Sequence, residues 1–253
     1  MYLGVDEAGK GPVLGPMVAA AVIADPASLP ADIDDSKRIS PARRDAMNSA
    51  IRDIDGVAVG VAFVEPTEID RPDTDMNTLT VRGQARAIRA ALVGHAGADG
   101  SHGARDPHGA RDDRGDRDGH DEPIRVLADA GDTSESRFAR RLGEFVADSS
   151  IGDGTDMPAV TVDARHGADG DDPVVGAASV VAKVARDARM AEVDDAYPDY
   201  TDVGSGYPSD PATRAFLREY VADHGDVPDC ARRSWATCDD VLAAAEQSGL
   251  DEF

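Results

Sequence analysis

The stretch that decides the fold is YLGVDEAGKGPVLGP, residues 2–16. It opens with an apolar run, residues 2–5, which predicts a β-strand. Asp6 and Glu7 follow directly, before a second apolar run. Because neighbouring strand residues point to opposite faces, these two carboxylates can reach one ion only if the strand ends or bulges there. A solvated hairpin turn with ordinary surface acids is the alternative for this stretch alone.

A glycine-rich turn, Gly9-Lys10-Gly11-Pro12, separates the two apolar runs. Its glycines allow distorted backbone and a close approach to a ligand, and Lys10 adds a positive charge that suits a phosphate. The tight connection also predicts that residues 2–5 and a strand over 14–24 form an antiparallel pair.

The remaining chain alternates strand and helix patterns, which predicts one α/β domain, or one with a small appendage, in 253 residues. A strand, helix and strand over 124–162 predict a parallel crossover. Further strands are expected over 56–64, 124–130 and 158–162, and helices over 41–53, 77–93, 135–146, 174–195, 211–222 and from 236 to about 246.

The segment 94–122 differs from the rest because it is rich in glycine, aspartate and arginine and has no Val, Ile, Leu, Phe, Tyr or Trp. It cannot bury apolar surface, so we expect a disordered or loosely ordered insertion. Its histidines lack the compact spacing of a metal site, which favours a solvated loop. They are His95, His102, His108 and His120.

The charge balance is strongly acidic, with a formal net charge of −23. Such a charge ordinarily repels nucleic acid and anionic membranes. However, the chain has only three lysines, Lys10, Lys37 and Lys183, which is typical of a protein that works in concentrated salt. At 1 M salt the Debye length is about 3 Å, so the acidity does not exclude a nucleic-acid substrate.

Two features of the sequence, the use of cysteine and the lack of a long apolar run, predict a soluble cytoplasmic protein. No signal segment opens the chain, so Cys230 and Cys238 are expected to stay reduced in a cytoplasmic protein, and a zinc site would lack its other ligands. No run reaches the 18 or more apolar residues of a membrane span, which predicts a soluble protein without membrane contact.

Acidic residues at strand ends and helix starts form the candidate active site. Asp6 and Asp129 each follow an apolar strand, so neighbouring strands would bring their carboxylates to one sheet edge, together with Glu7 and Asp169. Clustered carboxylates are stable mainly when a cation neutralises them, and oxygen ligands without His or Cys suit Mg²⁺ or Mn²⁺. Two such ions about 4 Å apart can hydrolyse a phosphodiester.

Five motifs in this order resemble ribonuclease HII, particularly its archaeal branch. They are DEAGKGPVLGP (6–16), DSKRIS (35–40), ADAGDTS (128–134), PVVGAASVVAKVARD (173–187) and GSGYPSDP (204–211). The resemblance implies a ribonuclease H-like fold, with a five-stranded mixed sheet flanked by helices and a small helical C-terminal portion. It also implies cleavage of RNA in RNA/DNA hybrids and on the 5′ side of single ribonucleotides in duplex DNA, leaving 3′-hydroxyl and 5′-phosphate ends.

The same resemblance assigns roles to residues that match the motifs. It makes Asp6, Glu7, Asp129 and Asp169 the metal-binding catalytic acids. The substrate 2′-hydroxyl would be read by a glycine, basic residue, glycine turn and a tyrosine, and phosphates by basic residues nearby. This chain has Lys10 where arginine is more usual, which weakens a bidentate phosphate contact. The implied substrate-binding residues are Gly9, Lys10, Gly11, Lys37, Lys183, Arg186 and Tyr207.

The last residues resemble the box by which replication and repair enzymes dock on sliding clamps, with Gln247, Leu250 and Phe253 at the matching positions. A frayed helical tail is the alternative. We therefore expect a catalytic domain over 1–200 with the 94–122 insertion, a helical portion over 201–246 and a clamp-binding tail over 247–253.

Two other functions remain open at this stage. One is a catalytically silent module that binds nucleic acid or a clamp, and the other is a DNA-directed nuclease of related architecture. The complete set of four acids favours the ribonuclease, because a silent module has no reason to keep mutually repelling carboxylates. The protein is expected to be a monomer.

Overall fold

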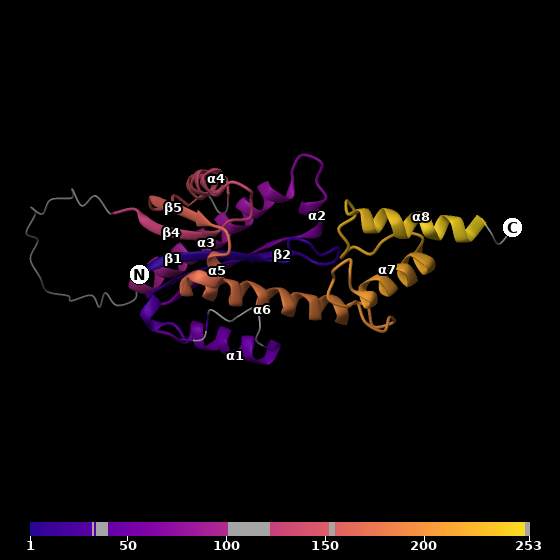
Figure 1. Ribbon diagram of the computed structural model, residues 1–253, viewed down its shortest axis with the longest axis horizontal. Helices are drawn as coiled ribbons and strands as arrows, with labels where there is room; N and C mark the ends of the chain where they lie inside the picture. Colours follow the sequence, from indigo (N-terminus) through magenta and orange to yellow (C-terminus); the bar gives the residue numbers. More distant parts are fainter. Residues whose placement is uncertain (32, 34–39, 101–121, 152–154, 251–253) are drawn as a thin grey trace, which may run out of the picture.

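The computed structural model describes residues 1–31, 33, 40–100, 122–151 and 155–250, with 97–100 and 248–250 described as helix backbone. A five-stranded mixed sheet in the order β3-β2-β1-β4-β5 forms its centre (Figure 1). The two predicted strand relations are confirmed, because β1 pairs antiparallel with β2, and β4 pairs parallel with β1 and with β5. The strands are β1 (Tyr2–Ala8), β2 (Met17–Ala24), β3 (Ala58–Val64), β4 (Ile124–Asp129) and β5 (Val160–Arg165).

Helices cover both faces of the sheet (Figure 1). One face packs against α3 (Met76–Gly100) and α4 (Glu135–Ala147), and the other against α1 (Pro41–Arg52) and α6 (Pro173–Asp195). Each interface is a separate cluster of buried apolar side chains, which confirms the predicted α/β layers. Short helical elements complete this part: η1 (Pro26–Ser28), α2 (Pro66–Ile69) and α5 (Ala168–Asp171).

The alternation of β1 decides which face each residue meets. Leu3 and Val5 join the cluster under α3 and α4, whereas Gly4 lies against α6. A Cβ on Gly4 would lie 2.5 Å from the carbonyl carbon of Val174, so only glycine lets α6 approach this closely. Glu7 therefore belongs to the α3 face and Asp6 to the α6 face.

The C-terminal part is helical, as predicted, and lies at one end of the sheet (Figure 1). It contains α7 (Pro211–His224) and α8 (Ala236–Leu250), which pack on each other around a third apolar cluster. Main-chain contacts tie it to the segment between β1 and β2, among them the Leu14–Ala231 bridge and a 2.8 Å hydrogen bond from Gly15 N to Cys230 O.

Several predicted boundaries were wrong. The second strand begins at Met17 and not at residue 14, because residues 13–15 bond to the C-terminal part. The helix that begins at Met76 continues through Gly100, so the first seven residues of the expected loose insertion are helical. Alanines at 96 and 98 favour that extension. The fifth strand likewise runs to Arg165, three residues past its predicted end.

Parts of other predictions lie outside the described residues. These are Lys37, Phe253, and the insertion over 101–121 with His102, His108 and His120. Cys230 and Cys238 are free thiols, as expected. None of the helices in the described part of the chain combines the length and apolar character that crossing a membrane requires.

Candidate active site

One pocket of about 530 Å³ is lined by all four predicted acids, Asp6, Glu7, Asp129 and Asp169. We call it the acid pocket. It lies where the C-terminal ends of the parallel neighbours β1 and β4 meet, beside the short helix α5. The four residues come from three separate segments of the chain, so the fold gathers them as the sequence predicted.

Asp6 and Glu7 reach the pocket without the expected strand end or bulge. β1 continues through Ala8, and its pairing with β2 is regular at these positions (Asp6 with Ala20, Glu7 with Ala19). The two carboxylates therefore leave opposite faces of the strand. Glu7 is approached from α3 and Asp6 from α6.

Asp129 and Asp169 lie on the same side as Asp6. Val5 pairs with Ala128, so Asp6 and Asp129 are adjacent at the ends of their strands. The Ala168 N–H donates a 2.8 Å hydrogen bond to Asp129 Oδ1, which holds the start of α5 against β4. Three acids thus gather on the α5 and α6 side, and Glu7 approaches from the α3 side.

Burial of the paired acids disfavours their charged forms. Desolvation raises the pKa of Asp6 to about 7, and the neighbouring carboxylates of Asp129 and Asp169 add to the shift. Desolvation and the charge of Asp6 raise the pKa of Glu7 to about 8. Ionising Asp6 and Glu7 is therefore costly in this pocket unless a cation neutralises them.

The donor chemistry of the pocket fits a hard divalent cation, since it offers four carboxylates and neither His nor Cys. Within the described residues, however, no group of three or more His, Cys, Asp or Glu side chains is arranged to hold a metal ion as it stands. Each of the four carboxylates accepts a hydrogen bond from the protein instead: Asp6 from Glu7 N, Glu7 from Gln84, Asp129 from Ala168 N and Asp169 from Ser179.

Gln84 on α3 is a site residue that the sequence analysis missed. Its side chain is fully buried, and its Nε2 donates to Glu7 Oε2 at 2.6 Å and to the Asp129 carbonyl at 3.1 Å. Its Oε1 is buried without a hydrogen-bond partner in the described structure. Gln84 thus fixes the carboxylate of Glu7 relative to the end of β4. The sequence signal is a polar residue on the same face of the helix as Val81, Ala87 and Ile88.

The predicted substrate-binding residues within the described part of the chain also line the acid pocket, but their side chains are differently engaged. Lys10 Nζ donates to the Gly131 carbonyl at 2.5 Å and to Asn77 Oδ1 at 3.2 Å. Lys183 donates to Ser179, whose hydroxyl lies 3.4 Å from Asp169 Oδ2. The ammonium of Lys10 is therefore directed at protein carbonyl and amide oxygens, and the main chain of the turn is left to face the pocket.

Arg186 and Tyr207 line the acid pocket together with the four acids. The Arg186 guanidinium lies 5.4 Å from the Tyr207 ring centroid and donates to the Ser205 carbonyl at 3.0 Å. Arg186 also packs against Gly9, whose φ of +84° favours glycine and whose added Cβ would lie 2.4 Å from Arg186 Nε. Tyr207 is 41% exposed, so its ring is accessible to a ligand.

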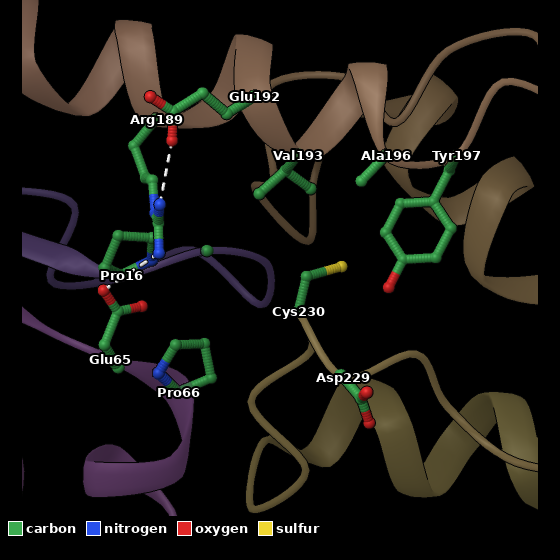
Figure 2. Close-up of a pocket in the computed structure, with 11 residues that line it drawn as sticks. Pro16, Glu65, Pro66, Arg189, Glu192, Val193, Ala196, Tyr197, Asp229 and Cys230 are labelled. Atoms are coloured by element: carbon green, nitrogen blue, oxygen red, sulfur yellow. Dashed lines mark hydrogen bonds and ion pairs between the residues drawn. The ribbon is translucent and has the colours of Figure 1, made fainter.

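Figure 2 shows a second pocket, of about 310 Å³, between α6, the start of β2 and residues 229–230. Arg189 donates to Glu192 at 2.8 Å and to Glu65 at 3.2 Å, so these two carboxylates are paired within the protein. Burial raises the pKa of the Cys230 thiol to about 11, which keeps it neutral. None of the predicted site residues lines this pocket.

Of the predicted clamp-binding residues, Gln247 and Leu250 lie on α8, which contributes no residue to the acid pocket. The helix runs to Leu250, four residues past its predicted end at about 246. Gln247 is exposed. The structure thus gives this tail a helical backbone up to residue 250.

Comparisons with known proteins agree with the fold and the motifs. The family model described as Ribonuclease HII matches residues 3–96 and 149–238, a range that contains Asp6, Glu7 and Asp169 but not Asp129. A protein named Ribonuclease HII from Haloarcula marismortui is 50% identical over 253 residues, covering 100% of both chains.

Two solved structures are also similar. One is the ribonuclease H2 from Pyrococcus horikoshii OT3, with a TM-score of 0.72, 29% identity and coverage of 97% of this chain and 98% of that one. The other is a PCNA:RNase HII complex from Archaeoglobus fulgidus, with a TM-score of 0.69, 30% identity and coverage of 93% and 95%. Because the family model does not cover Asp129, its place in the candidate site rests on strand pairing and on the pocket that it lines.

Proposed function

Because the chain belongs to the ribonuclease HII family, whose members are endonucleases of the ribonuclease H class, we propose that it cuts RNA embedded in DNA duplexes. The proposed substrates are the RNA strand of RNA/DNA hybrids and single ribonucleotides within duplex DNA. Cleavage falls on the 5′ side of the ribonucleotide and leaves 3′-hydroxyl and 5′-phosphate ends. The observation that carries the proposal is the meeting of four carboxylates from three chain segments in one pocket.

In the proposed mechanism the acids hold two divalent ions, Mn²⁺ or Mg²⁺. When bound, such ions supply a water activated for attack and positive charge at the leaving oxygen. Asp6, Asp129 and Asp169 would bind from the α6 side and Glu7 from the α3 side. Their negative charge keeps an ion in place, and no side-chain nucleophile is needed.

The chain's other pocket residues would bind and orient the substrate. The main chain of the 9–11 turn and the hydroxyl of Tyr207 would read the 2′-hydroxyl, the group that distinguishes RNA from DNA. Lys183 and Arg186 would place positive charge near the phosphates, and Lys37 is proposed for the same role. Gln84 would orient the Glu7 carboxylate through its hydrogen bond to Oε2.

The test is a duplex with one embedded ribonucleotide, incubated with Mn²⁺, with Mg²⁺ or with EDTA, and the cut mapped at nucleotide resolution. We expect a single cut on the 5′ side of the ribonucleotide, only with a divalent ion, and no cut in the matched all-DNA duplex. Cleavage of the all-DNA duplex would favour a DNA-directed nuclease. Binding without cleavage would favour the silent module.

We also propose that the C-terminal tail docks on a sliding clamp through Gln247, Leu250 and Phe253. Support comes from the similarity to the protein in the PCNA:RNase HII complex. A pull-down with the clamp from the same organism should lose the wild-type interaction when Leu250 and Phe253 are both changed to Ala, with cleavage unchanged. The proposal further includes a monomeric protein in the cytoplasm, which sedimentation and cell fractionation would test.

A further inference from the structure

Arg232 is the largest of the fully buried side chains in the described structure. All three hydrogen bonds of its guanidinium go to main-chain carbonyls of the segment between β1 and β2. Nη2 donates to Gly9 at 2.6 Å, Nη1 to Lys10 at 2.9 Å and Nε to Gly15 at 2.9 Å. An arginine from the C-terminal part thus holds the glycine-rich turn near the other end of the chain.

These bonds decide which way the peptide groups of the turn face. In a trans peptide the N–H points opposite to the preceding C=O, so the N–H groups of Lys10 and Gly11 point away from Arg232. Residues 9–11 line the acid pocket, whereas Arg232 does not. Among the described residues, neither N–H donates a hydrogen bond. Both are therefore available to a ligand in the pocket.

Trp235 adds a fourth bond of the same kind. Its Nε1 donates to the Gly11 carbonyl at 3.3 Å, and its ring lies 5.1 Å from the Arg232 guanidinium carbon. The carbonyls of three consecutive residues, Gly9, Lys10 and Gly11, are thus all directed to one short C-terminal segment. Such complete anchoring fixes the turn in one conformation.

Two arginines contact this turn in a strongly acidic protein. Arg186 packs against Gly9 from another side, and neither Arg186 nor Arg232 makes an ion pair among the described residues. Burial and the nearby charge of Arg186 lower the pKa of Arg232 to about 10, so it remains charged at neutral pH. Together they make the turn a site of positive potential for an electronegative oxygen.

We propose that Arg232 is a positioning residue that presents the N–H groups of Lys10 and Gly11 to the ribonucleotide, with Trp235 in a supporting role. The inference rests on the proposed function, since it takes the turn as the part that reads the substrate. Arg232 acts through the main chain and touches neither the reacting phosphate nor the acids.

The test variant is Arg232→Lys, which keeps the positive charge but cannot reach three carbonyls with a planar fork. Arg89→Lys is a matched control. Arg89 is also buried and also donates to two carbonyls, Val146 at 2.8 Å and Thr155 at 2.6 Å, but it does not line the acid pocket. Both variants should lower the melting temperature, so stability alone does not separate them.

Two measurements separate positioning from stability. Amide hydrogen exchange of residues 9–16, without nucleic acid, should become at least about tenfold faster in Arg232→Lys than in wild type and stay unchanged in Arg89→Lys. For the single-ribonucleotide duplex, Arg232→Lys should raise KM about tenfold with kcat within about threefold, as loss of substrate binding predicts. Arg89→Lys should change neither constant. Trp235→Phe, which removes one donor and keeps a ring, should shift both measurements in the same direction by a smaller factor.

Unchanged exchange in residues 9–16 of Arg232→Lys would overturn the inference, whatever the enzyme cuts. Faster exchange with unchanged KM would overturn it as well, because the turn would then not bind the substrate. If Arg232→Lys does not fold, hydrogen exchange of residues 9–16 and KM are measured in Trp235→Phe instead. If either value is unchanged there, the inference is overturned. If the wild-type protein cuts no ribonucleotide duplex, the proposed function itself is refuted. That result is seen in the wild-type assay, without any variant.

Discussion

Asp6 and Glu7 hold protons near neutral pH because burial and neighbouring carboxylates raise the pKa values to about 7 and 8. The unfolded chain loses the same protons near pH 4. Between about pH 4 and pH 8 the folded state therefore binds more protons, so the free energy of unfolding of the metal-free protein falls as pH rises. A divalent ion must displace these protons, and its binding strengthens over the same range.

This linkage predicts a pH-dependent stabilisation by Mn²⁺. Thermal unfolding with and without about 1 mM Mn²⁺ should show a larger rise in Tm at about pH 8.5 than at about pH 6, where protons compete with the ion. The Asp6→Asn variant, which lacks one of the titrating carboxylates, should show a smaller rise at both values. A Tm shift that is equal at both pH values in the wild type would contradict this account.

At the residue scale the sequence predicted the four acids but not their supports. Asp6 and Asp129 follow apolar strands, and that local pattern places them at one sheet edge. Asp169 stands at a helix start, and only the resemblance to the family joined it to them. Gln84 and Arg232 act on residues that are 77 and 223 positions away, so no local spacing could indicate their roles. The direction of the Lys10 ammonium also depends on a distant partner, the Gly131 carbonyl.

Among the elements, the contact between β1 and α6 holds the acid pocket together, because it brings Asp6 beside the helix that carries Ser179 and Lys183. The contact depends on the missing side chain of Gly4. Small buried residues early in α6, Gly176, Ala177 and Ala178, allow the same close approach. The sequence analysis did not identify Gly4 as the strand residue that makes room.

Two glycine substitutions test the close contact between β1 and α6 and the length of α3. Gly4→Ala should destabilise the protein by about 1–3 kcal/mol, since its Cβ would overlap the main chain of Val174. Gly94→Ala should stabilise it by up to about 1 kcal/mol, because Gly94 is exposed within α3 and a Cβ there meets nothing within 4 Å. Denaturant unfolding measures both. A destabilising Gly94→Ala would contradict the helix through that position, and a neutral Gly4→Ala would contradict the close approach.

Element boundaries were harder to predict than the elements themselves. Leu14 is an apolar residue of the kind that strands contain, but its main chain pairs with Ala231 in the C-terminal part. Residues 94–100 have no apolar periodicity, yet they extend a helix that tertiary contacts have already formed. In both cases the deciding interaction lies outside the local sequence.

Taken as a whole, the molecule combines a charge of −23 with a proposed polyanionic substrate. Its similarity to a protein from the halophilic archaeon Haloarcula marismortui fits the low lysine content. In molar salt the repulsion between surface carboxylates is screened within a few ångströms.

We therefore predict that stability and activity both depend on salt. Raising KCl from about 0.2 M to about 3 M should raise Tm, because screening relieves the self-repulsion of the folded state. Cleavage of the single-ribonucleotide duplex should increase over the same range. An osmotically matched sucrose series controls for effects that are not electrostatic. A Tm that does not rise with KCl would count against this explanation.

The central claim is that carboxylates from separate segments form one metal-dependent hydrolytic pocket, and the most direct measurement is the cleavage rate of Asp129→Asn. Single-turnover cleavage of the ribonucleotide duplex in Mn²⁺ should fall at least about a hundredfold, with an unchanged circular dichroism spectrum. The matched control is Asp163→Asn, an exposed aspartate of β5 that does not line the acid pocket, and its rate should stay within about twofold. Wild-type cleavage by Asp129→Asn would contradict the account.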